Sequence, residues 1–400
     1  MNTIAFFGPV NSGKSTLVNA IAGQEVSIVS SVPGTTTDPV RKRIELPGLG
    51  PCVLIDTAGL DDESLLGAER ARRTRAVLDE TDVAVVLEPV IPGLIGDLST
   101  AGIPYVKYSR GESVESLLER IRQVAPKEEE RFLTGKLVKA GDTVLLVMPQ
   151  DSEAPKGRLI LPQVQVIREL LDRGCTPLCC TPASLEAAIG TLKAAPALVI
   201  TDSQVFGIVN KTIPANWPLT SFSVLLAGAK GDLRIFLQGA RAIDSLQSGA
   251  RILIAEACTH VPDTEDIGRV KIPALLRQRI AAIAEGVVGC KPVATLGRVR
   301  GRGPLEPVPV GGAEASAKAV CNPTNPCSDS SALTIDIAAG NDFPEELGGY
   351  DLIIHCGACV ATAALVRART RKALLAGVPI TNYGLALAQL NGILNRISLP

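Results

Sequence analysis

Both histidines of this 400-residue chain lie beside cysteines, in two segments that are far apart in the sequence. His260 follows Cys258 in the stretch EACTHVPD, and His355 precedes Cys356 and Cys359 in the stretch IIHCGACV. Thiolates and imidazoles are ligands that suit Zn2+ and iron–sulfur clusters. The two segments therefore predict one metal site, although their spacing alone does not distinguish structural zinc from an iron–sulfur cluster.

A second stretch whose residues could take part in chemistry is GPVNSGKS, which matches the Gly-x4-Gly-Lys-Ser pattern of phosphate-binding loops. Gly8 and Gly13 allow the backbone to wrap so that successive N–H groups face the phosphates. Lys14 adds a positive charge near the β- and γ-phosphates, and Ser15 offers a hydroxyl to Mg2+. The nucleotide-binding residues that we predict in this loop are Gly8, Asn11, Ser12, Gly13, Lys14, Ser15 and Thr16.

Two further stretches agree with a nucleotide site. In PGTTTD, Thr36 could complete the coordination of Mg2+ and sense the γ-phosphate. In DTAGL, Asp56 supplies a carboxylate for the Mg2+ site, and the backbone N–H of Gly59 could contact the γ-phosphate. Together the three stretches have the layout of a translation-factor-like GTPase, whose switch loops order around bound GTP.

The Asn-Lys-x-Asp sequence with which such GTPases read guanine does not occur in the chain. NKTI at 210–213 lacks the Asp, and AKGD at 229–232 lacks the Asn. Between DVAVVLE and GIPYVKYS there is room for one short helix, so the predicted sheet lacks the strand that would carry the motif. Because a site built to hydrogen-bond one base edge discriminates by ~10^4–10^5, we predict weak guanine preference or weak nucleotide binding.

The elements that must position these residues alternate between strand-like and helix-like patterns, which indicates an α/β protein with parallel sheets. We place a GTPase domain at 1–126, a second domain at 137–213 and a third at 214–400, with a charged linker between the first two. The stretch 280–332 is rich in Gly, Pro, Ala and Ser and predicts a flexible insertion. Its Cys321 and Cys327, separated by five residues, are a weak metal signal.

Each Cys/His segment directly follows a strand-like run, RILIAEA or YDLII. Because α/β sheets place their sites at the carboxyl ends of parallel strands, we expect these two strand ends to meet. We also expect Cys356 and Cys359 to open the helix-like stretch VATAALVRARTRKALL, whose first N–H groups would favour thiolates.

Two further sets of apolar residues are typical of a hydrophobic core. In LPQVQVIRELLDRG, five residues at helical spacing predict one apolar stripe: Leu161, Val164, Ile167, Leu170 and Leu171. Free cysteines are commonly small core residues. We interpret four of the remaining cysteines in this way: Cys52, Cys175, Cys179 and Cys180.

The composition argues against several classes of partner. The net charge is −1, the pI is near 6.2 and aromatic residues are 3% of the chain, so we expect neither nucleic acid nor an anionic membrane surface as partner. No apolar run reaches the ~18 residues that span a bilayer, and we expect no signal peptide. Ten cysteines without a secretory signal favour free thiols or metal ligands, so we expect a cytoplasmic protein.

Taken together, these motifs closely resemble the family of FeFe-hydrogenase maturation GTPases, the HydF family, a branch of the TrmE/Era-like GTPases. The likeness extends over nearly the whole chain through VPGTTTDPV, DTAGLDD, EAPKGRLILPQVQ, TDSQVF, LTSFS, EACTH, DIGRVKIP, IIHCGAC and GVPITNYG. The resemblance implies three domains: GTPase, dimerisation and cluster-binding. It also implies a 4Fe–4S cluster bound by Cys258, Cys356 and Cys359, with His260 or His355 as a weak fourth ligand or with that position exchangeable.

The resemblance further implies a scaffold that delivers the diiron subcluster to apo FeFe-hydrogenase, together with radical-SAM maturases as partners. A homodimer and K+-stimulated GTP hydrolysis follow from the same likeness, with Asn11 as the K+ ligand. Two other hypotheses stay open. A zinc-stabilised regulatory GTPase would use the same cysteines without cluster transfer. A tRNA-modification GTPase would need a basic RNA surface and a helical partner domain, and the sequence predicts neither.

Overall fold

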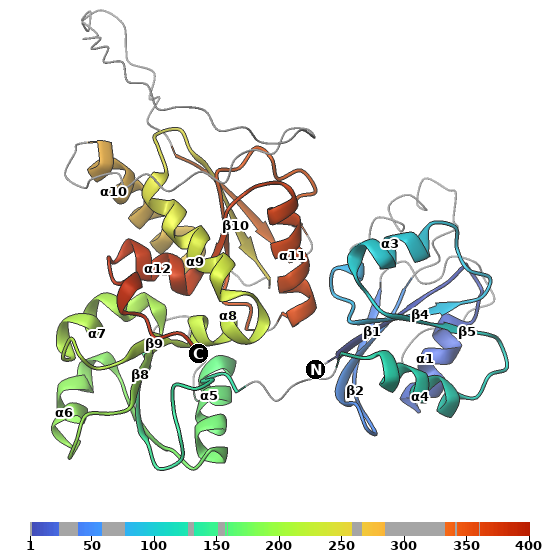
Figure 1. Cartoon of the computed structure of the whole chain (residues 1–400), viewed down its shortest axis with the longest axis horizontal. Coiled ribbons are helices and arrows are strands. Elements are labelled where there is room, and N and C mark those ends of the chain that lie inside the picture. Colours follow the sequence, from blue (N-terminus) through green and yellow to red (C-terminus); the bar gives the residue numbers. More distant parts are fainter. Residues whose placement is uncertain are drawn as a thin grey trace, which may run out of the picture.

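The computed structural model places the chain in three sheets with flanking helices (Figure 1). It describes residues 2–23, 39–57, 77–126, 132–150, 157, 159–257, 266–284, 333–340, 342–359 and 361–400. Within these residues, no helix has both the length and the hydropathy of a membrane-spanning segment. The predicted α/β class is confirmed, with two parallel sheets and one mixed sheet.

The first sheet, with strand order β2-β3-β1-β4-β5, forms the GTPase-like domain at the right of Figure 1. Its neighbouring strands run parallel, except that β2 is antiparallel to β3. The one short helix that we expected before the last strand is α3. The elements of this domain are β1 (Asn2–Phe7), α1 (Lys14–Ala22), β2 (Val40–Leu46), β3 (Gly50–Asp56), β4 (Val83–Leu87), α3 (Leu94–Ala101), β5 (Tyr105–Tyr108) and α4 (Val114–Val124).

The second sheet has the order β7-β6-β8-β9 and is parallel throughout. It continues beyond residue 213, where we placed a boundary from the sequence, because β9 follows that position. The elements are β6 (Thr143–Val147), α5 (Leu161–Asp172), β7 (Thr176–Cys180), α6 (Leu185–Gly190), β8 (Leu198–Thr201), α7 (Phe206–Thr212), β9 (Leu219–Ser221) and α8 (Phe222–Lys230).

The third sheet, parallel with the order β11-β10-β12-β13, contains both strands that precede the Cys/His segments. Residues 280–284, the start of the expected insertion, belong to helix α10, and 285–332 lie outside the described residues. The elements are α9 (Leu233–Ala242), β10 (Arg251–Glu256), α10 (Ile272–Ala284), β11 (Thr334–Ala339), β12 (Leu352–His355), α11 (Ala363–Leu375), β13 (Ile380–Asn382) and α12 (Tyr383–Leu390).

The second and third sheets share one hydrophobic core, which runs from Leu145 of β6 to Ile397 near the end of the chain. At Gly239 of α9 an added Cβ would lie 2.0 Å from the Ile380 carbonyl oxygen, so only glycine lets α9 approach β13 this closely. The GTPase domain packs its two faces into separate clusters. The two later sheets therefore form one packed unit, and the GTPase domain forms another.

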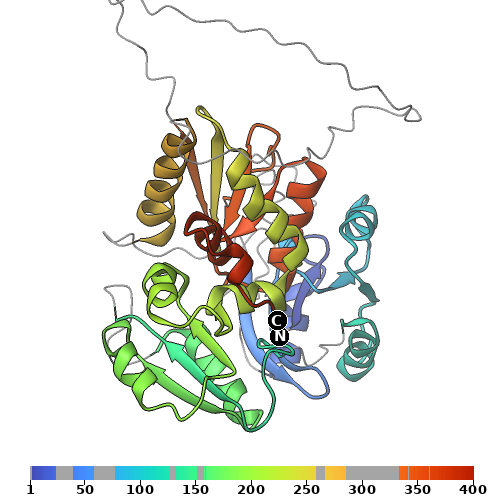
Figure 2. The same cartoon turned by 60° about the vertical axis from the view of Figure 1, so that its left-hand side comes forward.

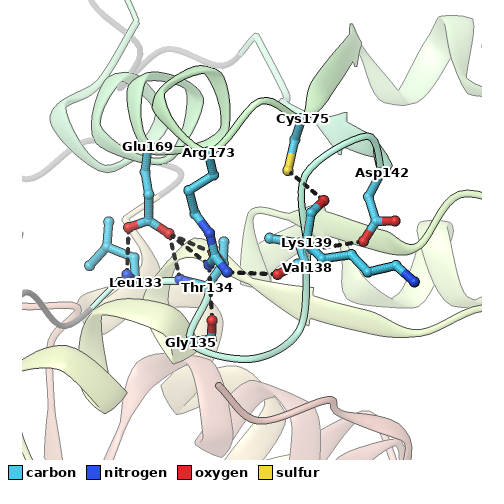
Figure 3. A network of polar contacts seen from close by, with 9 residues as sticks. All are labelled: Leu133, Thr134, Gly135, Val138, Lys139, Asp142, Glu169, Arg173 and Cys175. Atoms are coloured by element: carbon cyan, nitrogen blue, oxygen red, sulfur yellow. Dashed lines mark hydrogen bonds and ion pairs between the residues drawn. The ribbon is translucent and has the colours of Figure 1, made fainter.

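A polar network fixes the start of the second domain to α5 (Figure 3). The Glu169 carboxylate accepts hydrogen bonds from two backbone N–H groups and from the buried Thr134 hydroxyl. Arg173 donates to the same hydroxyl and to the carbonyls of Gly135 and Val138. The carboxyl-terminal part of the linker predicted at 126–136 is thus packed structure from Phe132 onward, whereas 127–131 lie outside the described residues.

Two expectations about the second domain are wrong. The stripe on α5 does not face one core, because Leu161, Val164 and Leu171 are 44%, 47% and 56% exposed while Leu170 is buried. Cys179 is exposed rather than buried, because it lies on β7 at the edge of the sheet. An exposed apolar helix face beside an edge strand is a feature of surfaces that pair with another chain.

Candidate functional site

The phosphate-loop motif lies between β1 and α1, as the sequence predicts. Asn11 and Gly13 adopt left-handed backbone conformations, with φ of 60° and 93°. An added Cβ at Gly8 would lie 2.7 Å from Ser12 Oγ and 2.9 Å from Leu87 Cβ, so the loop needs glycine there. These conformations wrap the backbone of residues 8–13 into the concave turn that a phosphate group requires.

The side chains of the motif converge on the carboxyl end of β3. Lys14 is buried and its ammonium donates hydrogen bonds to the carbonyls of Gly8 (2.9 Å) and Pro9 (2.6 Å). The Ser15 hydroxyl donates to the Asp56 carboxylate at 2.6 Å, because β1 and β3 are parallel neighbours. A hydroxyl and a carboxylate in contact at a phosphate loop are suited to hold a hydrated Mg2+.

The structure describes only some of the remaining residues that we predict to bind the nucleotide. Asn11 and Thr16 are exposed on the loop and the first turn of α1, and Ser12 Oγ is buried with no hydrogen-bond partner among the described residues. Thr36 and Gly59 lie outside the described residues. At the far end of the sheet, β5 is followed by Ser109 and Arg110, where no Asn-Lys-x-Asp sequence is present.

The strand ends that precede the two Cys/His segments meet in the third sheet, as we expected. β10 and β12 pair in parallel, with Ala255 opposite His355. One residue beyond the end of β10, the Ala257 N–H donates to the Cys356 sulfur at 3.1 Å. Cys258 and His260 themselves lie outside the described residues, but the residue directly before Cys258 contacts the Cys356 thiol.

The Cys-x-x-Cys segment forms a loop and not the first turn of a helix, so that expectation is wrong. Helix α11 begins at Ala363, with Thr362 as its N-cap residue. Ala358 has a left-handed conformation with φ of 53°, and its N–H points back to the Cys356 sulfur at 3.4 Å. The backbone therefore curls around the Cys356 sulfur before the helix starts.

Lys230, at the end of α8, supports this loop from the side of the second domain. Its ammonium donates to the carbonyls of Ala358, Cys359 and Ala361 at 2.5, 3.2 and 3.0 Å, which uses all three of its N–H groups. Burial lowers the pKa of Lys230, an effect that negative charge on Cys359 and Cys356 would oppose. The site thus combines a half-buried cation with two cysteines.

The chemistry of the two described cysteines fits a thiolate-bound metal. Burial raises the pKa of the Cys356 thiol, and the two amide N–H groups that point at its sulfur act in the opposite direction. A half-buried thiol of this kind ionises when a metal displaces its proton, and N–H groups then stabilise the sulfur charge. Among the described residues no set of three metal ligands is complete, since the Cys258 segment is not part of them.

His355 is buried, and both of its ring nitrogens have partners. An Arg369 N–H lies 3.2 Å from Nε2, and because a guanidinium can only donate, Nε2 must be the acceptor. Nδ1 then carries the proton and donates to the Cys356 carbonyl at 3.0 Å. Burial is the main cause that lowers the pKa of His355 to about 4, so the ring is neutral at pH 7. No sequence pattern indicated the role of Arg369.

The fold and the phosphate loop define a P-loop GTPase domain joined to two further α/β domains with a cysteine loop. The family model of the 50S ribosome-binding GTPases matches residues 3–132. The models of the hydrogen maturase F dimerization and tetramerization domains match residues 133–231 and residues 234–288 with 327–400. The chain belongs to the hydrogen maturase F (HydF) family.

Comparisons with individual proteins reach only part of the chain. A tRNA modification GTPase MnmE from Methylobacterium sp. (strain 4-46) is 47% identical over 88 residues, and one from Myxococcus xanthus is 45% identical over 92 residues. The match covers 22% and 23% of this chain and 20% of each relative. The chain therefore spans about a fifth of the length of these relatives.

Solved structures show the same partial likeness. Aquifex aeolicus Era bound to GDP.AlF4- has 18% identity and a TM-score of 0.26, over 45% of this chain and 93% of Era. S. thermophilus NFeoB bound to GDP.AlF4- and K+ has 18% identity and a TM-score of 0.20, over 31% of this chain and 62% of NFeoB.

Proposed function

We propose that the chain is a maturation factor of FeFe-hydrogenase that holds a 4Fe–4S cluster and delivers the diiron subcluster to the apo-enzyme, with a GTP-dependent switch attached. The observation that carries this proposal is the contact between Ala257 and the Cys356 sulfur, because it joins the two distant cysteine segments at one sheet edge. We expect this activity in the cytoplasm, in concert with radical-SAM maturases.

Cys258, Cys356 and Cys359 are the proposed cluster ligands. Three cysteine ligands leave one iron of the cluster open to a further ligand, which is the chemistry that a carrier needs. Of the two histidines, His260 is the better candidate for that position, because both nitrogens of His355 are already hydrogen-bonded. We propose that His355 instead orients the Cys356 backbone.

Lys230 should matter for cluster binding although it is not a ligand. Lys230→Met would leave three loop carbonyls without their charged donor, each hydrogen bond contributing about 1.5–3 kcal/mol, and would remove a positive charge beside the thiolates. We expect fewer iron atoms per chain after reconstitution and a lower midpoint potential in an EPR-monitored redox titration. The exposed Lys193 supplies the matched control, Lys193→Met; equal iron content and potential in both variants would contradict a role for Lys230.

We further propose that the phosphate loop binds GTP with Mg2+, held by Ser15, Thr36 and Asp56, and that Asn11 ligates K+. Because no guanine-reading sequence follows β5, the ratio of GTP to ATP binding constants should stay below about a thousandfold. Competition between fluorescent GTP and unlabelled ATP measures this ratio. Lys14→Ala should weaken the binding of both nucleotides alike; a larger GTP/ATP ratio would show that guanine is recognised by other residues.

The matched oligomerization domains support a homodimer, and the exposed α5 face is the surface that we propose for it. Leu171→Glu would place a charge in that apolar face and should shift the protein from dimer to monomer in sedimentation equilibrium. Ile208 of α7 is exposed to a similar extent, 53%, and offers the control Ile208→Glu. Dissociation by the control but not by Leu171→Glu would assign the interface to another face.

The decisive test is the activation of a separately expressed apo FeFe-hydrogenase by the anaerobically purified protein loaded with its diiron precursor. The proposed function requires hydrogen evolution with the natural protein and none with Cys356→Ser. Full activation by Cys356→Ser would remove cluster ligation from the mechanism. Colourless protein with stoichiometric zinc and no EPR signal after reduction would identify a zinc-stabilised GTPase instead.

A further inference from the structure

Helix α11 connects the cysteine loop to the rest of the third sheet through one buried arginine. The Arg369 guanidinium donates to the carbonyl of Glu256, to His355 Nε2 and to the carbonyl of Gly340. These groups lie at or one residue beyond the carboxyl ends of β10, β12 and β11. Arg369 also stacks over the Phe343 ring at 5.0 Å. A displacement of α11 would therefore act directly on the strand ends that precede the cysteines.

The other cations of α11 point to the GTPase domain. Arg367 donates to the Asp82 carboxylate at 2.9 Å, and Lys372 forms an ion pair with Asp79. With 3.6 residues per turn, Arg367 and Arg369 lie on opposite sides of the helix. The helix has four cations and no acidic residue between Ala363 and Leu375. It lies against the GTPase domain in both views (Figures 1 and 2).

The GTPase carboxylates that receive these cations are connected to the nucleotide motifs along the chain. Asp79 follows the stretch 58–76, which begins within the DTAGL motif that we assign to γ-phosphate sensing. Asp82 accepts a hydrogen bond from the Thr3 N–H at 3.0 Å at the amino-terminal end of β1, and the phosphate loop follows the opposite end of the same strand.

A third contact is made at the end of α3. Arg371 donates to the carbonyl of Ala101, the last residue of that helix. Carbonyl groups at a helix end carry partial negative charge, which favours a cation there. The contact surface on the GTPase domain thus consists of two carboxylates and a helix end, all of negative character, opposite a positive helix face.

We propose that the basic face of α11 is the surface by which the GTPase domain communicates its nucleotide state to the cysteine site. The proposal rests on the function proposed above. The side chains of Arg367 and Lys372 are 56% and 37% exposed, so water reaches the cation of each ion pair and limits the strength of the pair. A change at the γ-phosphate that moves Asp79 shifts α11, and Arg369 passes this shift to the ends of β10, β12 and β11.

The test is amide hydrogen exchange of the full-length, cluster-loaded protein with Mg2+-GDP and with a non-hydrolysable GTP analogue. We expect exchange rates in α11 and in peptides 251–257 and 351–356 to differ between the two nucleotides by about threefold or more. Lys372→Asp should abolish this nucleotide dependence. The double variant Asp79→Lys with Lys372→Asp, which reverses the ion pair, should restore it.

Arg234→Asp is the matched control, since Arg234 is 90% exposed on α9 and pairs with the nearby Asp232. This variant should keep the nucleotide dependence. Identical exchange with both nucleotides in the natural protein, or dependence retained in Lys372→Asp, would overturn the inference.

Two further measurements on the same samples separate this inference from the proposed function: binding of a fluorescent GTP analogue and iron content. If the natural protein fails to bind the GTP analogue or contains no iron, the proposed function is overturned together with this inference. If the natural protein binds the GTP analogue and contains iron, but its amide hydrogen exchange is the same with both nucleotides, this inference alone is overturned.

Discussion

Cys356→Ser is expected to retain less than about a tenth of the iron of the natural protein after anaerobic reconstitution. The Cys356 sulfur lies where the two cysteine segments meet and is the acceptor for N–H groups from both of them, Ala257 and Ala358. Serine is a poor ligand for iron–sulfur clusters, and its shorter C–O bond withdraws the donor atom from this position. Iron analysis together with the visible absorption of the cluster measures the loss.

Cys179→Ser provides the matched comparison, because Cys179 is an exposed cysteine on the edge strand β7 of another sheet. Its iron content should equal that of the natural protein. An equal loss in the two variants would indicate a general effect of thiol removal. Iron retained in full by Cys356→Ser would exclude this sulfur as a ligand.

Arg369→Met should destabilise the unit formed by the second and third sheets by about 3 kcal/mol. The substitution leaves the buried Glu256 carbonyl and the buried Nε2 atom of His355 without this donor, together with the half-buried Gly340 carbonyl, and an unsatisfied buried acceptor costs about 1–3 kcal/mol. The volume of methionine compensates part of this loss. Urea unfolding followed by the fluorescence of Trp217, the one tryptophan of the chain, reports on this unit because Trp217 packs against its core.

Arg234→Met is the control for that measurement, since the Arg234 side chain is 90% exposed and its ion-pair partner Asp232 is 40% exposed. Its expected cost is below about 1 kcal/mol. Equal destabilisation by the two substitutions would show that the buried hydrogen bonds of Arg369 contribute little.

The phosphate loop and the strand ends could be predicted because their signals are local. GPVNSGKS requires glycines at set positions, and the apolar runs before Cys258 and Cys356 are typical of buried parallel strands. Four strands were missed: β9 and β13 have three residues each, β11 is the edge strand TIDIAA of the third sheet, and β2 is an edge strand in which every second residue is charged. The alternation in VRKRIEL was the available signal for β2.

Other features of the site could not be predicted because they depend on contacts between distant residues. The Cys-x-x-Cys segment stays out of α11 while Lys230, 129 positions before Cys359, binds its carbonyls. The partners of His355 are likewise set by the fold, since Arg369 reaches it from the next helix. On α5, helical periodicity identifies apolar positions but does not tell a core from an interface, since both exclude water.

The single core that joins the second and third sheets has a consequence for the assembled protein. In a dimer formed through α5, continuous side-chain packing would connect each cysteine loop to the dimer interface. Lys230 lies where the second and third sheets meet, because its ammonium binds a carbonyl of the cysteine loop. The two proposed metal sites would then keep a constant separation. An acceptor protein would therefore bind a rigid unit formed by the second and third sheets of both chains. The GTPase domains would be the parts that can change position relative to this unit.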